Sequence, residues 1–207
     1  MIFKILSVGP LSANCFILGC EESGEGVVVD PGGEPERVIA AIERLGLRII
    51  YIINTHGHFD HIGGNAGLLE HTGARLLLHE RDVHLLSRAV TVAARYGVEG
   101  ENSPEPHSFL EDEMLLAFGK HRIRVIHTPG HTPGGCCLYI AEEGMLISGD
   151  TLFADGVGRT DLPGGSHEQL IDSIRTRLLT LPEETKVFPG HGPSTTIGRE
   201  KRSNPYI

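Results

Sequence analysis

Short apolar segments recur along the whole chain, and this pattern restricts the fold more than any other feature of the sequence. Each segment spans only a few residues, and Gly or Pro lies at the junctions between them. Such segments are typical of buried strands separated by turns. The predicted strands are 3–8, 15–18, 27–30, 48–53, 75–78, 114–118, 122–127, 136–140, 145–148 and 186–188.

Helical patterns lie between these strands in both halves of the chain. The first helix is expected from Pro35, which suits a first helical turn, to the stop signal Gly46. A second is expected at 65–71. A third begins at Ser166, which has the capping-box spacing with Gln169 and precedes a one-sided apolar pattern. The segment 96–112 lacks periodicity, and we expect an irregular loop there.

Two strand-rich halves, each with helices, predict two facing sheets covered on the outside by helices. This is an α/β fold with four αββα layers, which buries both faces of each sheet. The chain has 207 residues, a length that fits one domain, so we expect a single domain over 1–207.

The charge balance and the cysteines restrict the partners and the compartment. There are 18 Lys+Arg against 27 Asp+Glu, a formal net charge of −9, which disfavours a nucleic-acid partner. The first residues do not resemble a signal peptide, and no apolar run is long enough for a membrane span. Four cysteines without a disulfide-scaffold spacing favour the cytoplasm. The sequence does not indicate the oligomeric state.

The chain has 12 histidines, and three of them gather with a carboxylate directly after the predicted strand 48–53. They are His56, His58 and His61, with Asp60 among them. Side chains alternate along a strand, so His56 and His58 point the same way and can bind one ion. Asp60 and His61 would project to a neighbouring position that could hold a second ion.

Three further polar residues follow apolar runs in the second half of the chain: His131, Asp150 and His191. With the first group they give five imidazoles and two carboxylates. Such nitrogen- and oxygen-rich donor sets hold zinc, iron or manganese and leave room for a shared water or hydroxide. The sequence therefore predicts a site for two divalent metal ions, Zn²⁺ being preferred over iron or manganese.

The run His-x-His-x-Asp-His, followed by a distant His, Asp and His, resembles the signature of the metallo-β-lactamase superfamily. The resemblance spans nearly the whole chain and implies an αββα sandwich. It also implies which residues bind which ion. The first ion would be held by His56, His58 and His131, the second by Asp60, His61 and His191, and both by Asp150 as a bridge.

Within that superfamily the chain is similar to the small glyoxalase II-like hydrolases, related to hydroxyacylglutathione hydrolase. The similarity lies in segments 149–153, 158–165, 190–193 and 204–206. It implies a thioesterase for a small-molecule substrate, in which a metal-bridging hydroxide attacks the thioester carbonyl. Asp60 would orient that hydroxide, and Arg159 would clamp a substrate carboxylate. The related enzymes have a Tyr near the position of Asp161.

Two other functions use the same residues. Persulfide dioxygenase-like relatives bind a single iron with two His and one Asp, and a metal-binding scaffold without catalysis would have lost part of the donor set. All seven donors are present, and segments 189–193 and 204–206 favour the hydrolase. The sequence does not identify the acyl group or the thiol of the substrate.

Overall fold

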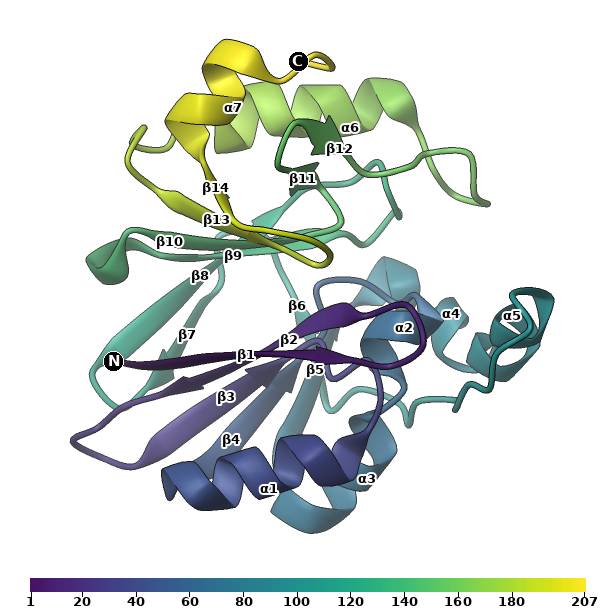
Figure 1. Ribbon diagram of the computed structural model, residues 1–207, viewed down its shortest axis with the longest axis vertical. Helices are drawn as coiled ribbons and strands as arrows, with labels where there is room; N and C mark the ends of the chain where they lie inside the picture. Colours follow the sequence, from purple (N-terminus) through teal and green to yellow (C-terminus); the bar gives the residue numbers. More distant parts are fainter. The chain divides into compact units, whose positions relative to one another are not determined.

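The computed structural model describes residues 1–207 and contains two six-stranded sheets with helices packed on them (Figure 1). The chain divides into two compact units. The first comprises Met1–Phe109 with Ala117–His121, and the second comprises Leu110–Leu116 with Arg122–Ile207. The mixed α/β class with two sheets is thereby confirmed, whereas the single domain stays a prediction.

The sheet of the first unit has the strand order β1-β2-β3-β4-β5-β6. Its first three strands pair antiparallel, and β3, β4 and β5 pair parallel. Parallel pairing brings the carboxyl ends of β3 and β4 to one edge of the sheet. The strands are β1 (Ile2–Val8), β2 (Ala13–Gly19), β3 (Glu25–Val29), β4 (Arg48–Ile53), β5 (Arg75–His79) and β6 (Ser108–Leu110).

Two helices, α1 (Pro35–Leu45) and α3 (Asn65–Thr72), pack on this sheet. Val38 of α1 and Leu68 of α3 belong to one buried cluster with Val28 and Ile52 of the strands. Burying such aliphatic side chains contributes about 1.5–3 kcal/mol each. α1 ends at Gly46, whose left-handed conformation (φ 66°) agrees with the stop predicted there.

A second apolar cluster of this unit gathers the short helices that follow β4 and β5. Phe59 and Ile62 pack there with Leu86 and Ala93. The sequence did not predict the short helices after β5, and β6 forms the last part of the predicted loop 96–112. The elements are α2 (Phe59–Ile62), η1 (Glu80–Asp82), α4 (Val83–Leu86) and α5 (Ala89–Arg95).

The sheet of the second unit has the order β14-β13-β10-β9-β8-β7. β10 pairs parallel with β13, and the neighbouring pairs β8/β9, β9/β10 and β13/β14 are antiparallel. A small hairpin, β11/β12, lies beyond β10. The elements are β7 (Leu115–Phe118), β8 (His121–His127), β9 (Cys136–Ile140), η2 (Ala141–Glu143), β10 (Met145–Gly149), β11 (Leu152–Phe153), β12 (Gly156–Val157), β13 (Lys186–Pro189) and β14 (Thr195–Thr196).

The helices of this unit pack on its sheet through a single buried cluster. α6 (His167–Ser173) continues into a π-helix, η3 (Ile174–Leu178), and α7 (Ile197–Ser203) follows β14. Leu170 and Leu178 pack there with Leu146 and Val187 of the strands. The Ser166 hydroxyl accepts a hydrogen bond from the Gln169 N–H, as its capping spacing predicted. None of the helices in either unit combines the length and the apolar character needed to cross a bilayer.

All four cysteines are free thiols with buried side chains. Cys136 and Cys137 are neighbours within β9, where burial raises the pKa of the Cys137 thiol to about 11. A thiol that stays protonated at neutral pH is a poor nucleophile, so Cys137 acts as a core residue of the strand, and Cys136 is buried beside it.

Candidate metal centre

Three imidazoles and a carboxylate gather where β4 passes into α2. His56 and His58 lie in the connecting segment, and Asp60 and His61 lie on α2 itself. The His56 ring is centred 4.8 Å from the His58 ring and 4.2 Å from the His61 ring. The local chain thus brings together the four residues that the sequence predicted as one group.

A buried carboxylate, Asp30, orients two of these rings. It follows β3 at φ 50° and accepts hydrogen bonds from the Thr55 N–H (2.7 Å) and the Thr55 hydroxyl (2.7 Å). It also lies 3.0 Å from His61 Nδ1, and the Thr55 oxygen lies 3.1 Å from His56 Nδ1. Because Asp30 and the Thr55 oxygen act as acceptors here, both rings carry their proton on Nδ1. Nε2 is then the lone-pair atom of each ring, as metal binding requires.

The donor atoms of Asp30, His56 and His61 lie within 4.8 Å of one another, which is itself a spacing that can hold an ion. The hydrogen bonds of Asp30 give it another role. Its carboxylate contacts Nδ1 of His61 directly and reaches Nδ1 of His56 through the Thr55 hydroxyl, so it serves as a support for the candidate metal ligands.

The backbone around α2 is held by further buried polar residues. Asp82 accepts a hydrogen bond from the Gly57 N–H (3.0 Å), and Asn54 donates one to the carbonyl of His61 (3.0 Å). Gly32 packs against the carbonyl oxygen of Asp60, with which a Cβ at this position would collide. The donors of this cluster are therefore positioned by the fold before any ligand binds.

The second unit carries the other three predicted donors. His131 follows β8, Asp150 follows β10, and His191 follows β13, the parallel partner of β10. The Nδ1 of His131 lies 2.7 Å from the carbonyl oxygen of Arg159, so its proton also sits on Nδ1. Asp150 Oδ2 lies 3.6 Å from His131 Nε2 and 3.8 Å from His191 Nε2. The structure thus places the carboxylate between the two imidazoles.

These spacings fit donors arranged around a divalent ion. In the first unit, Asp60 Oδ2 lies 3.8 Å from His61 Nε2, which resembles the two distances at Asp150. All three are too long for a hydrogen bond between the two atoms. Donors about 2.0–2.2 Å from a tetrahedral metal lie about 3.3 Å apart, so a small contraction of each pair would seat an ion.

Arg159, the predicted substrate clamp, is exposed and forms two hydrogen bonds of 2.8 Å with the carboxylate of Asp161. These bonds lower the pKa of Asp161 to about 2, so the carboxylate stays ionised at neutral pH. A substrate carboxylate would have to compete with Asp161 for the guanidinium group.

Sequence reasoning selected seven candidate donors, which stay a prediction, and missed the residues that orient them. Asp30 and Thr55 were not selected, although one signal was available. Asp30 follows an apolar strand directly, as Asp150 does. The hydrogen bond from His61 to Asp30 joins residues 31 positions apart, and no local pattern predicts such a pair.

Comparison with known proteins relates both units to one family. Residues 8–191 match the model of the metallo-β-lactamase superfamily. A curated relative, the hydroxyacylglutathione hydrolase GloC of Haemophilus influenzae, is 38% identical over 209 residues, with 100% of this chain and 98% of the relative covered.

Solved structures agree with this relationship. The BLEG-1 B3 metallo-β-lactamase has a TM-score of 0.92 at 39% identity and 99% coverage of both chains. TTHA1623 in a di-iron-bound form has a TM-score of 0.91 at 41% identity, with 99% of this chain and 100% of that chain covered. ETHE1 from Myxococcus xanthus has a TM-score of 0.82 at 30% identity, with 99% of this chain and 84% of that chain covered. The family model and the shared two-sheet fold show that this chain belongs to the metallo-β-lactamase superfamily.

Proposed function

We propose that this protein is a metal-dependent thioesterase of the glyoxalase II type. The observation that carries the proposal is the orientation of the imidazoles. His56, His61 and His131 each have Nδ1 beside a protein oxygen, which leaves Nε2 as the donor atom. Two ions would be held by the seven predicted donors. They are His56, His58 and His131 for the first, Asp60, His61 and His191 for the second, and Asp150 as the bridge.

Two divalent ions would supply a water molecule of lowered pKa and positive charge beside the carbonyl oxygen. The protein residues do the rest. Asp150, whose Oδ2 lies 3.6 and 3.8 Å from two imidazole Nε2 atoms, would supply the negative charge of the second unit's donors. We assign Asp60 the additional role of accepting a hydrogen bond from the attacking water. A thiolate leaving group has a thiol pKa of roughly 8.5, so it departs without a protein acid.

The thioester class is supported by the similarity to GloC, which covers both chains almost completely. Two alternatives have support of their own. The similarity to ETHE1 is compatible with an iron dioxygenase, and the similarity to BLEG-1 is compatible with hydrolysis of a lactam. The seven-donor set favours a dinuclear hydrolase over a single iron with three protein ligands. It also disfavours a scaffold without catalysis.

Metal analysis and substrate assays on one preparation test this function. Protein purified without added metal should contain about two zinc, iron or manganese ions per chain and should hydrolyse S-D-lactoylglutathione. Oxygen uptake with glutathione persulfide and the opening of a β-lactam are measured in parallel. One iron per chain, with oxygen uptake and no thioester hydrolysis, would show that the dioxygenase alternative is right.

We also propose that Arg159 binds a carboxylate of the substrate, in competition with Asp161. Asp161→Asn should then lower KM for a carboxylate-bearing thioester by about two- to fivefold, the effect of one exposed ion pair. Asp161 is protonated only as the pH falls through about 2, so this effect should be constant across the neutral range. In an Arg159→Ala background the same substitution should leave KM unchanged, and an equal decrease in both backgrounds would contradict the role of Arg159.

A further inference from the structure

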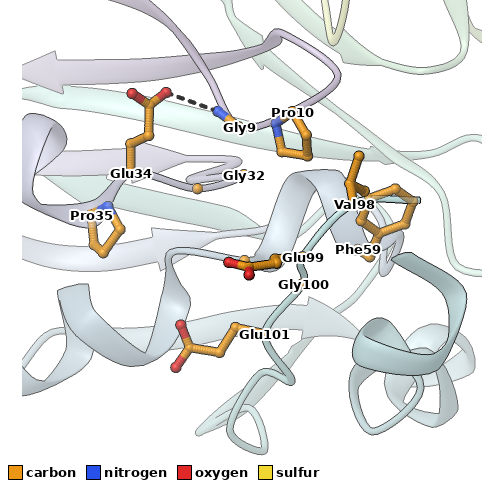
Figure 2. Close-up of a pocket in the computed structure, with 12 residues that line it drawn as sticks. Gly9, Pro10, Gly32, Glu34, Pro35, Phe59, Val98, Glu99, Gly100 and Glu101 are labelled. Carbon is orange, nitrogen blue, oxygen red and sulfur yellow. Dashed lines mark hydrogen bonds between the residues drawn. The ribbon is translucent and has the colours of Figure 1, made fainter. Parts of the chain in front are cut away.

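A cavity of about 810 Å³ lies in the first unit beside α2 (Figure 2). Its walls come from the β1–β2 turn, the segment before α1, α2 itself and the segment after α5. None of the seven donors lines it, although Phe59, which does, lies between His58 and Asp60 in the chain. The volume is typical of small-molecule sites. The cavity is thus distinct from the donor set but shares a helix with it.

One part of the cavity wall is apolar. Phe59 and Val98 belong to the same apolar cluster and lie together in Figure 2, with Pro10 nearby. The Phe59 ring packs against the ring of Tyr96, with centroids 5.5 Å apart. This contact holds the Phe59 ring, which is 7% exposed, in place as an apolar part of the wall.

The other part of the wall carries three carboxylates and no Lys or Arg. Glu34 accepts hydrogen bonds from Arg37 (2.8 and 2.9 Å) and from the Gly9 N–H (3.1 Å). Glu99 and Glu101 are exposed, and in Figure 2 they extend from their loop toward the side where Glu34 lies. Glu99 and Glu101 therefore give the mouth of the cavity a negative charge that no basic residue of its wall offsets.

The loop that carries Glu99 and Glu101 is anchored on both sides. Before it, the Val98 N–H donates to the carbonyl of Ala93 (3.2 Å). After it, Asn102 accepts from the Val90 N–H (3.1 Å), and the Ser103 N–H donates to the carbonyl of Leu86 (3.2 Å). Because the backbone is already fixed, a ligand would not have to order this loop on binding.

We infer that this cavity binds the acyl tail of the substrate and that the tail is an alkyl chain ending in a cationic ammonium group. The inference rests on the proposed function, in which the thioester reacts at donors carried by α2. The alkyl chain would lie along Phe59 and Val98, and the ammonium group would lie beside Glu99 and Glu101. An anionic tail would be repelled by the same carboxylates.

Two thioesters of N-acetylcysteamine that differ only in charge test this inference. One carries a 6-trimethylammoniohexanoyl group, and the other carries its neutral isostere, 7,7-dimethyloctanoyl. Because both substrates make the same apolar contacts, the ratio of the kcat/KM of the cationic substrate to that of the neutral one reports the effect of the charge alone. In the double variant Glu99→Gln/Glu101→Gln this ratio should fall about three- to tenfold, because two exposed ion pairs are lost. The neutral substrate should keep its kcat/KM.

The matched control is Glu80→Gln/Glu105→Gln, which changes the net charge equally at exposed positions outside the cavity. It should leave the ratio unchanged. An unchanged ratio in the cavity variant, or an equal decrease in the control, would overturn the inference.

If the wild type hydrolyses neither thioester, hydrolysis of S-D-lactoylglutathione still decides the proposed function, and the cavity is judged separately by binding. Hexyltrimethylammonium should shift the amide resonances of 98–101 in the wild type and not in the double variant. If it shifts none of them in the wild type, the cavity does not bind cationic tails.

Discussion

Asp150→Ala should reduce thioester hydrolysis by at least about 100-fold, the loss typical when a main electrostatic group of an active site is removed. Metal content should fall as well. Asp150 lies between the Nε2 atoms of His131 and His191, at 3.6 and 3.8 Å. Without the carboxylate two neutral imidazoles would remain in the second unit. They offer no negative charge to a divalent ion.

Metal content by elemental analysis and kcat/KM for S-D-lactoylglutathione check this result. Asp150→Asn keeps the size of the side chain and should show a similar loss, which separates the missing charge from a packing defect. Asp172→Ala removes an exposed carboxylate of α6 and should keep both metal and activity. If Asp150→Ala retained wild-type metal content and activity, the seven-donor centre would be wrong.

Asp30→Asn should weaken metal binding by about 10- to 100-fold, as expected when a residue that orients a metal ligand is lost. Asparagine tolerates the left-handed conformation at φ 50° and nearly matches aspartate in size. Its NH₂ group, however, would face donors in either orientation: the Thr55 N–H at the Oδ1 position, or both His61 Nδ1–H and the Thr55 hydroxyl at the Oδ2 position. With the NH₂ group at the Oδ2 position, relief of this conflict would move the His61 proton to Nε2 and remove the lone pair proposed to bind the metal. With the NH₂ group at the Oδ1 position, it would oppose the Thr55 N–H and weaken the support of the Asp30 side chain.

Competition with a chromophoric chelator measures the affinity change, and thermal unfolding measures stability. Thr55→Val removes the support of His56 and one hydrogen bond that Asp30 accepts, but it keeps the contact between Asp30 and His61, so it should have a smaller effect than Asp30→Asn. Thr55→Ser keeps the hydroxyl and should bind metal normally. Equal affinity in the wild type and Asp30→Asn would show that the tautomer of His61 is not set by Asp30.

The sequence predicts those features of the fold that depend on neighbouring residues. The apolar strands, the Gly46 stop and the Ser166 cap each depend on residues a few positions apart, and all three are confirmed. His56, His58 and His61 lie close together because all three belong to one short stretch of chain that follows β4. Periodicity and spacing describe such features fully.

The remainder depends on contacts between distant segments. Asp30 supports His61 from a different strand end, and Asp82 holds Gly57 from 25 positions away. The cavity beside α2 likewise needs three segments that are far apart in the chain. Arg159 is instructive because its partner, Asp161, is only two positions away. The short spacing could have predicted that Asp161 binds the Arg159 guanidinium and so competes with a substrate carboxylate for it.

The polar residues of the candidate centre follow the carboxyl ends of β3, β4, β8, β10 and β13, whereas the apolar side chains of those strands form the two cores. The residues that stabilise the protein and the candidate metal donors are therefore different sets. Substitutions in the connecting segments can alter ligands, metal and substrate while the sheets keep their packing. This independence lets the fold diversify during evolution, and it explains how a β-lactamase and an ETHE1 protein share it at TM-scores of 0.92 and 0.82.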